Sequence, residues 1–491
     1  MSSHLLSKSS FIKGLQCEKH LYLYRNYYNE MDELSEMQKA IFKRGTNVGE
    51  LARMLFPGGK VAAQGNPPDY DKALEVTKTL IDNNTKVIYE AAFMFDKILS
   101  IADIAVRKDD NWFIYEVKSS TSVSETYIND AALQYYVISN MGIKVKDFYI
   151  VYINNKYVRN GELSIKDLFV VQSVLESILP LQDNVRENVK RFKKLLMQNR
   201  IPSIDIGEHC YSPYRCSFFN YCRKHIPEDS IFDFSGMHLQ KKYELYNGGI
   251  VKLDDVPENF ALSKSNKLQL EAYASSKSFI DKKEINNFIS DLSYPILFMD
   301  FETFQPAVPL FDNSRPFQQI PFQYSIHLKE KNNDQLKHFQ FLAEPGEDPR
   351  LKFIESLLKD VRGEADIIVY NKAFEVGRLK EIARDFPQYS DEIHNLILRI
   401  KDLMVPFQKK YYYAPQMKGS YSIKAVLPAL VPDLNYDKLE INEGGLASLA
   451  YERLQTETDL MFIADIKQQL LEYCKIDTLG MVRILEKLNN L

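Results

Sequence analysis

The segment Pro295-Ile-Leu-Phe-Met-Asp300-Phe-Glu302-Thr303 decides the fold of the C-terminal half of the chain. The residues before Asp300 are nearly all apolar, which predicts a strand buried on both faces. Because residues two apart on a strand point the same way, Asp300 and Glu302 should project together from its end. Such a pair of carboxylates repels itself, and a hard divalent cation such as Mg²⁺ or Mn²⁺ offsets that repulsion. The alternative is a surface strand that ends in two incidental acids.

Two later segments could complete a site at this strand. Val369-Tyr370-Asn371-Lys-Ala-Phe374-Glu375 runs from an apolar strand end into a helix. Tyr473 and Asp477 stand at positions i and i+4 of a strongly periodic segment, so they share one face of a helix. Between these two segments of the chain, Ser422 is a suitable N-cap for a helix that begins at 423. Lys424, in its first turn, either contacts phosphate or is an ordinary exposed lysine.

In this order, the three segments resemble the motifs of the DnaQ-like DEDD exonucleases of the tyrosine subtype. The resemblance covers about Tyr294 to Leu491 and implies a ribonuclease H-like mixed sheet with flanking helices and a 3′–5′ exonuclease activity. The implied site uses two Mg²⁺ or Mn²⁺ ions held by Asp300, Glu302, Glu375 and Asp477, with Tyr473 orienting or deprotonating the attacking water and with Asn371 and Lys424 binding substrate. The family usually has Asp where Glu375 stands. The added methylene moves the carboxylate oxygens by more than about 1 Å, a displacement that can lower activity.

Apolar and alternating runs predict an α/β core in each half of the chain. In the C-terminal half, strands are expected at Ile296–Asp300, Gln323–Leu328, Lys337–Phe341 and Ile367–Val369, and helices near Arg350–Leu358, Phe374–Arg384 and Asp459–Leu488. In the N-terminal half, strands are expected at Val87–Met94, Leu99–Val106, Trp112–Val117 and Asp147–Ile153, and helices at Asn129–Met141 and about Ile165–Asn199.

A second group of charged residues follows the N-terminal strands. Asp103 ends an apolar strand, and Glu116 and Lys118 lie two apart on the next strand, hence on one face. Two acids and a lysine suit metal-dependent hydrolysis, in which the acids hold Mg²⁺ and the lysine positions water or offsets phosphate charge. The alternative is a hairpin with ordinary cross-strand salt bridges.

With Gln134 on the following helix, this arrangement resembles the RecB-like PD-(D/E)XK nucleases, whose core is restriction-endonuclease-like. The resemblance implies that Gln134 binds substrate or supports the site. Many relatives carry a histidine upstream in a Gly-x3-His pattern, whereas this chain has Gly45-Thr-Asn-Val-Gly49. Glu90 is the candidate for the missing metal ligand.

Four of the five cysteines bracket the N-terminal half: Cys17 precedes it, and Cys210, Cys216 and Cys222 follow it. This distribution resembles the iron–sulfur branch of the RecB-like family and implies a [4Fe–4S] cluster that joins the two ends of the domain. By ligand count alone, four thiolates suit Zn²⁺ equally well, although neither late spacing fits a zinc knuckle. Cys474 lies far from the group and is expected to be a small apolar filler.

Length and composition set limits on this interpretation. A chain of 491 residues exceeds one core, and we expect a nuclease domain at 1–225, a connector at 226–290 and an exonuclease domain at 291–491. A net charge of −4 argues against coating nucleic acid by charge alone, so phosphate binding must be local or metal-mediated. Without a signal-peptide pattern or a long apolar run, the chain is expected to be cytoplasmic and independent of membranes.

Both halves together resemble a bacterial two-domain family with a RecB-like, cluster-bearing half and a DnaQ-like half. The resemblance implies a metal-dependent nuclease in repair, recombination or defence, with DNA favoured over RNA as its partner. Two alternatives stay open: a nucleic-acid-binding scaffold with one inactive site, favoured by the missing histidine and by Glu375, and an RNA-processing exonuclease.

Overall fold

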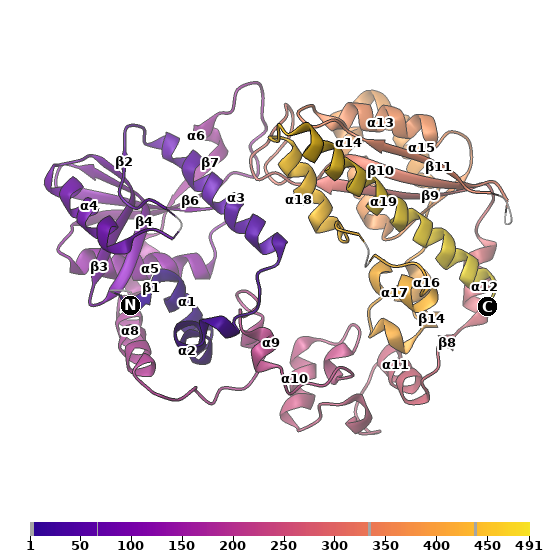
Figure 1. Cartoon of the computed structure of the whole chain (residues 1–491), viewed down its shortest axis with the longest axis horizontal. Helices are drawn as coiled ribbons and strands as arrows, with labels where there is room; N and C mark the ends of the chain where they lie inside the picture. The colour runs from indigo at the N-terminus through magenta and orange to yellow at the C-terminus, as the bar shows by residue number, and fades with distance from the viewer. Residues whose placement is uncertain (1–3, 66, 332–334, 437–438) are drawn as a thin grey trace. The chain divides into compact units, whose positions relative to one another are not determined.

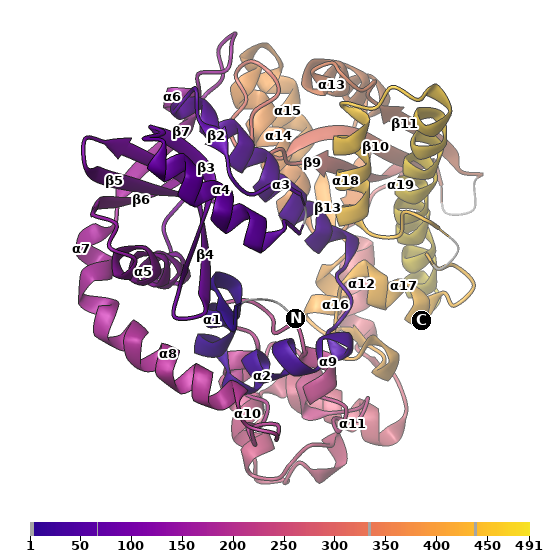
Figure 2. The same cartoon turned by 60° about the vertical axis from the view of Figure 1, so that its left-hand side comes forward.

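The computed structural model describes residues 4–65, 67–331, 335–436 and 439–491. Its contacts group the chain into two units (Figures 1 and 2). Unit 1 comprises Met1–His225 with Ala307–Phe317, and unit 2 comprises Ile226–Pro306 with Gln318–Leu491. Arg159 holds the segment Ala307–Phe317 in unit 1, because its guanidinium donates hydrogen bonds to the carbonyls of Pro309 (3.1 Å) and Leu310 (2.8 Å).

Unit 1 is built on a seven-stranded mixed sheet with the order β2-β3-β4-β5-β6-β7, in which β1 pairs with β4. The strands are β1 (Leu6–Ser7), β2 (Lys60–Val61), β3 (Val87–Phe95), β4 (Ile98–Lys108), β5 (Asn111–Lys118), β6 (Val145–Ile153) and β7 (Phe169–Ser173). The helices are α1 (Lys8–Gln16), α2 (Glu18–Asn26), α3 (Glu36–Ala52), α4 (Tyr70–Asp82), α5 (Glu125–Asn140), α6 (Ile165–Leu168), α7 (Leu175–Ile178), α8 (Gln182–Leu196) and α9 (Phe219–Cys222). The four strands expected from the sequence are confirmed as β3 to β6.

The core of unit 1 has one apolar layer on each face of this sheet. Leu133 of α5 and Phe192 of α8 pack against Ile114 and Ile150 on one face. Val48 of α3 packs on the other face, in one cluster with strand side chains that point away from α5. Because side chains alternate along a strand, Glu116 and Lys118 share the face that carries α5.

One expected element of unit 1 is wrong. The single helix predicted over about Ile165–Asn199 is divided into α6, the edge strand β7, α7 and α8. The segment Phe169-Val-Val-Gln-Ser is β-branched at its centre and pairs antiparallel with β6 from Ser173 to Phe169. Its pairing with a sheet edge outweighs the helical pattern of the residues on either side.

Unit 2 contains a five-stranded mixed sheet with the order β11-β10-β9-β12-β13. The strands are β9 (Ile296–Phe304), β10 (Ile320–Lys329), β11 (Lys337–Leu342), β12 (Asp366–Val369) and β13 (Ile400–Asp402), and a small separate sheet pairs β8 (Phe279–Ile280) with β14 (Tyr412–Tyr413). β10 is antiparallel to both of its neighbours, whereas β12 runs parallel to β9 and to β13. The chain is therefore a mixed α/β protein with mixed sheets in both units.

Helices cover both faces of the β9 sheet (Figure 1). Leu297, Met299 and Phe301 pack against the helices α13 (Pro349–Asp360), α14 (Lys372–Asp385) and α15 (Ser390–Leu398). The remaining face of β9 contacts α18 (Gly444–Leu454) and α19 (Leu460–Asn489). Asp300 and Glu302 alternate with the apolar residues, so they face α18 and α19.

The segment 226–290, expected to be a connector, contains helices and a small core of its own. Its helices are α10 (Leu239–Asn247), α11 (Lys264–Ser275) and α12 (Lys282–Ser290), and α16 (Val405–Gln408) and α17 (Ile423–Leu430) complete unit 2. Ile231, Phe234, Leu245 and Leu253 form a buried cluster within the segment. Among the described residues, no helix is both long and apolar enough to cross a membrane.

Candidate active sites

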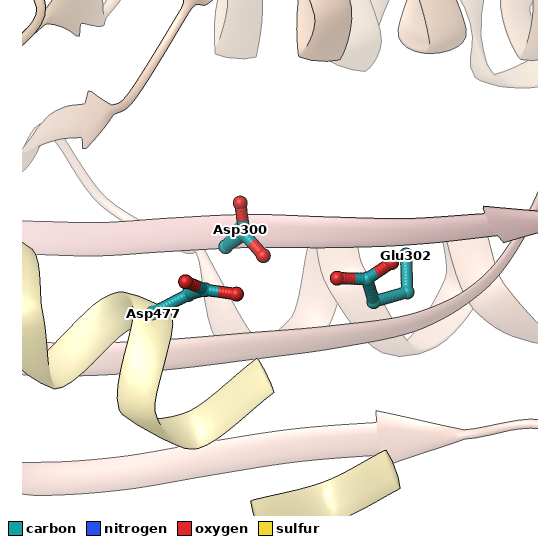
Figure 3. Close-up of side chains that lie close together, drawn as sticks. All are labelled: Asp300, Glu302 and Asp477. Atoms are coloured by element: carbon teal, nitrogen blue, oxygen red, sulfur yellow. The ribbon is translucent and has the colours of Figure 1, made fainter. Parts of the chain in front are cut away.

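Three carboxylates of unit 2 converge on one point. Asp300 and Glu302 come from β9, and Asp477 comes from α19 (Figure 3). One carboxylate oxygen from each lies within 4.8 Å of the others. The strand supplies two acids on one face, and the helix crossing that face supplies the third. Glu302 and Asp477 are buried and Asp300 is partly buried.

Burial and mutual repulsion make the charged forms of these acids unfavourable. The pKa of Asp300 is raised well above its usual range by burial and by the charge of Asp477. The pKa of Glu302 is raised in the same way by burial, Asp300 and Asp477. Burial also raises the pKa of Asp477, against the opposing effect of Lys424 and of hydrogen bonds from Tyr436 and Tyr473. The site therefore holds excess protons unless cations compensate the charge.

The residues around Asp477 provide only part of that compensation. Tyr436 donates a hydrogen bond of 2.5 Å to Asp477 Oδ1. Lys424 Nζ lies 3.7 Å from the same oxygen, and it lies 3.1 Å from the centre of the Tyr436 ring. Lys424 thus sits beside the acids instead of pointing to solvent, and its pKa is lowered by burial. Three clustered hard oxygen donors with one nearby ammonium fit a divalent ion such as Mg²⁺ or Mn²⁺.

Glu375 lies near this group but outside it. It occupies the first turn of α14 and is 1% exposed. Its pKa is raised well above the usual range by burial and by Asp300, and its own charge raises the pKa of Glu302. Among the described residues, Glu375 Oε2 is buried without a hydrogen-bond partner. Glu375 is therefore a fourth acid in electrostatic contact with the group, with an oxygen available to a further ligand.

The junction that positions Glu375 depends on Asp402, to which the sequence assigned no role. Asn371 begins α14 with a left-handed backbone (φ 76°) and is exposed. The Asp402 carboxylate accepts hydrogen bonds from the backbone N–H groups of Asn371 (3.1 Å) and Lys372 (3.0 Å). Since β13 runs parallel beside β12, their carboxyl ends lie together. The strand-like run before Asp402 was the available signal for this placement.

Tyr473 and Cys474 border the acids from α19. Burial, Asp477 and Glu302 raise the pKa of Tyr473, so its hydroxyl keeps its proton at neutral pH. Gly444, the first residue of α18, approaches both groups: a Cβ there would lie 3.6 Å from Glu302 Oε2 and 3.9 Å from the Tyr473 hydroxyl. Cys474 Sγ lies 3.6 Å from Asp300 Oδ2. The expected role of Cys474 as an apolar filler is thus incomplete, because its thiol can donate a weak hydrogen bond to the acid.

In unit 1, Glu116 is the centre of a buried charged network. Its Oε1 accepts hydrogen bonds from Lys8 Nζ (2.6 Å) and Lys118 Nζ (2.7 Å), and its Oε2 accepts one from Gln134 Nε2 (2.8 Å). Lys118 also donates to Asp130 Oδ2 at 2.6 Å. The expected residues Glu116, Lys118 and Gln134 therefore lie in direct contact. Sequence reasoning missed Lys8 and Asp130, although Asp130 stands one helical turn before Gln134.

The acids of this network differ in protonation. Burial raises the pKa of Glu116, but Lys118 and Lys8 outweigh that effect and hold it at about 2. Burial and the charge of Glu116 raise the pKa of Asp103 to about 8. Asp103 Oδ2 accepts the backbone N–H of Val117 at 2.6 Å. Glu116 is thus charged and Asp103 largely protonated at neutral pH, an unequal pair typical of functional sites.

Glu90 is engaged by a cation. It lies on β3 with φ 51°, between residues whose partners on β4 are Ile104 and Ala102. Arg53 Nη2 contacts Glu90 Oε1 at 2.8 Å. In the described part of the chain, Asp300, Glu302 and Asp477 form the one group of three or more acids, histidines or cysteines at mutual ligand distance. Glu90, Asp103 and Glu116 do not lie at that spacing.

Four cysteines line one small cavity at the other end of unit 1. Cys17 stands between α1 and α2, and Cys210, Cys216 and Cys222 come from the segment around α9, together with Phe218 and Phe219. Gln16 Nε2 donates to the carbonyls of His209 (2.9 Å) and Tyr214 (2.7 Å), and His20 contacts Ser217 Oγ at 2.9 Å. Burial raises the pKa of Cys216 to about 12. Four free cysteines from both ends of the unit thus line one space. Among the described residues, no three of their sulfur atoms lie at the mutual ligand distance that the acids of unit 2 reach.

One segment of the chain is similar to a described family. Residues 297–422 match the model of a domain of unknown function, DUF2779. The match includes Asp300, Glu302 and Glu375, and it ends before Lys424 and Asp477. It therefore covers nearly all of β9 and the whole of α14, but not the helix that supplies the third acid.

Similar curated proteins come from Ureaplasma and Mycoplasma species. The chain is 29% identical over 279 residues to Uncharacterized protein UU173 of Ureaplasma parvum serovar 3, covering 52% of this chain and 39% of that protein. It is 24% identical over 380 residues to Uncharacterized protein MG366 of Mycoplasma genitalium, covering 70% of this chain and 55% of that protein. The matches thus span between about two fifths and just over half the length of these relatives.

Proposed function

We propose that this protein is a metal-dependent nuclease that hydrolyses phosphodiester bonds, with DNA as the favoured substrate. The observation that supports it most is the approach of Asp300, Glu302 and Asp477 to within 4.8 Å on a buried strand and helix. Without a bound cation, the charged forms of these acids are unfavourable, as the raised pKa values of Asp300 and Glu302 indicate. Hydrolysis of a phosphodiester is a reaction for which clustered acids that hold divalent cations are suited.

Each residue of the site has a proposed part in a 3′–5′ exonuclease reaction. Asp300, Glu302 and Asp477, with Glu375 beside them, would hold Mg²⁺ or Mn²⁺. When bound, these ions supply an acidified water and charge stabilisation at the leaving oxygen. The protonated hydroxyl of Tyr473 would orient the water as a donor and not act as its base. Lys424 and Asn371 would contact substrate phosphate and the adjacent nucleotide.

A second nuclease site is proposed in unit 1. Asp103 and Glu116 would hold a divalent ion there, and Lys118 would position water or offset phosphate charge. Glu90 is the third proposed ligand; in this structure it is paired with Arg53, and the three acids do not lie at mutual ligand distance. The four thiols of Cys17, Cys210, Cys216 and Cys222 would hold a [4Fe–4S] cluster, with Zn²⁺ as the alternative. Either the cluster or the zinc ion would stabilise unit 1 by joining its two ends.

Degradation of end-labelled single strands tests the main proposal. The full chain is incubated with DNA or RNA of the same sequence, with Mg²⁺, Mn²⁺ or EDTA. We expect metal-dependent shortening from the 3′ end, faster on DNA, and a loss of about 10²-fold or more in Asp300→Asn, since misplacing a metal ligand has effects of this size. Faster RNA shortening would identify an RNA-processing enzyme.

The matched control is Glu392→Gln, which neutralises an exposed acid on α15 of the same unit. It should degrade DNA at the rate of the unmodified chain. If Asp300→Asn and Glu392→Gln degrade DNA equally, the acid cluster of unit 2 is not the exonuclease site. Binding of DNA without degradation by any metal-loaded form would favour the scaffold alternative.

A further inference from the structure

Unit 1 contains a cavity of about 430 Å³ that shares only Lys8 with the sites described above. It lies beside the β1–α1 junction and is walled by α2 and by the start of α4. Its volume falls in the range of sites that enclose small organic molecules, roughly 300–1,000 Å³. The residues that line it come from one compact unit, so its shape does not depend on unit 2.

Both charged side chains in the cavity wall are cationic. Lys8 and Arg25 line it together with the hydroxyls of Ser7, Ser9 and Ser10. Arg25 is exposed on the last turn of α2. An arginine, a lysine and several hydroxyls are the donors that bind phosphate oxygens in nucleic-acid sites. Asp71, an exposed acid at the first turn of α4, is close enough to act on His4 in the wall.

The wall also contains three tyrosines, beside the aliphatic side chains of Leu5, Leu21, Leu99 and Ile101. Tyr24, Tyr28 and Tyr70 line the cavity, and Tyr28 is 55% exposed. The rings of Tyr24 and Tyr28 meet edge to face at 5.5 Å, which leaves ring surface of Tyr28 open to a ligand. Aromatic side chains beside cations recognise single-stranded nucleic acid, because every base offers a face for stacking.

We propose that this cavity binds one nucleotide unit, with its phosphate at Arg25 and Lys8 and its base against Tyr28. The choice of a nucleotide among phosphorylated ligands rests on the proposed nuclease function. Either a free mononucleotide or a nucleotide within a single strand supplies this chemistry.

Lys8 connects the cavity to the charged network of unit 1. Its side chain lines the cavity, and its Nζ contacts Glu116 Oε1 at 2.6 Å. A nucleotide in the cavity therefore lies next to the proposed second nuclease site. The cavity would then hold the part of a strand that flanks the bond at Glu116 and Lys118.

Binding is measured on the full chain in EDTA by the anisotropy of a fluorescein-labelled thymidine octanucleotide. Competition with thymidine 5′-monophosphate, thymidine and inorganic phosphate separates the possible ligands. We expect Arg25→Gln and Tyr28→Leu each to weaken strand binding about tenfold, since a phosphate contact or a stacked base has an effect of that order. Arg25→Lys should recover part of the affinity because it keeps the charge.

Two matched controls lie outside the cavity. Tyr27→Leu changes the adjacent exposed tyrosine, and Arg186→Gln changes an exposed arginine of α8. Both should bind within twofold of the unmodified chain. Competition by the monophosphate but not by thymidine indicates a site that accepts an isolated nucleotide, and competition by neither indicates one that needs the strand; both support the proposal.

The proposal is overturned if Arg25→Gln and Tyr28→Leu bind like their controls, or if inorganic phosphate displaces the strand and does so as effectively as the monophosphate. The proposed catalysis is tested separately in the same material. If the unmodified chain binds the strand in EDTA but does not cleave it in Mg²⁺, the proposed nuclease function is refuted and the nucleotide-binding cavity is retained. If the chain cleaves the strand but the cavity variants bind normally, the nuclease function is retained and the nucleotide-binding cavity is refuted.

Discussion

At the scale of single residues, the acids of unit 2 oppose folding when no cation is present. The native state retains protons on Asp300 and Glu302 to a higher pH than an unfolded chain, in which Asp titrates near about 3.9. A raised native pKa means that stability is lost as pH rises from the unfolded value through the native one. A cation that binds the charged acids restores the lost stability.

Asp300→Asn should therefore stabilise the metal-free protein. Because the amide needs no proton to be neutral, we expect the Tm of unit 2 in EDTA to rise by about 2–4 °C at pH 8, the shift for a change near 1 kcal/mol in a unit of this size. The gain should shrink toward pH 5. Differential scanning calorimetry across this range checks the prediction. Excess Mg²⁺ should reverse the order, and a Tm that falls at every pH would show that Asp300 stabilises the fold by itself.

Tyr473→Phe distinguishes a donor from a base. The raised pKa of Tyr473 keeps the hydroxyl protonated, so its loss should remove one hydrogen bond to the reacting groups. We expect the rate of strand shortening to fall by about 10²-fold, typical of losing a preorganised donor. The pH dependence of kcat should keep its shape, because no titrating base is removed. If kcat of this variant no longer changes with pH on the alkaline side, Tyr473 acts as the base instead.

At the scale of elements, the joining of α1 and α2 to the segment around α9 should depend on the cysteines. In sequence, Cys17 is separated from the other three by strands β2 to β7. Loops of this length cost little more to close than short ones. Cys216 is buried in the shared cavity wall. If a metal group binds the four thiols, it joins the two ends of the unit.

Cys216→Ser should lower the Tm of unit 1 by about 5 °C or more and leave that of unit 2 unchanged. Protein purified without oxygen should be brown, and elemental analysis should find about four irons per chain, the content of a [4Fe–4S] cluster. The serine variant should be colourless. One zinc per chain in colourless protein would replace the cluster by a zinc site. Equal destabilisation of both units would contradict a local role.

At the scale of the molecule, two charged sites lie in two units that each have a core of their own. Their chemistry also differs: unit 2 gathers acids with one nearby lysine, whereas Glu116 in unit 1 is already paired with two lysines. The protein is therefore expected to carry two activities that can be removed one at a time.

Lys118→Met should abolish cleavage that does not start at a 3′ end and spare 3′–5′ shortening. Asp300→Asn should have the opposite effect, since sites in separate units that share no partners respond independently. A circular single strand and a linear strand with a blocked 3′ end report on unit 1, and a 5′-labelled linear strand reports on unit 2. If circular DNA stays intact with the unmodified chain, the network around Glu116 is structural and the scaffold alternative applies to unit 1.

Much of the site in unit 2 could be predicted locally. Alternation along β9 puts Asp300 and Glu302 on one face, and the i, i+4 spacing puts Tyr473 and Asp477 on one side of α19. These relations hold wherever a strand or helix forms, because they follow from the geometry of a few consecutive peptides. The same reasoning placed Glu116 and Lys118 together on β5.

Long-range packing decided the rest. Lys8 reaches Glu116 because α1 packs on the face of the sheet that carries α5, and Arg53 reaches Glu90 from a segment distant in sequence. The division of the expected long helix by β7 likewise depends on the free edge of β6. Burial of apolar faces selects which elements meet, and that choice depends on the whole chain. Residue pattern therefore determined which side chains point together, and tertiary structure determined which charges they meet.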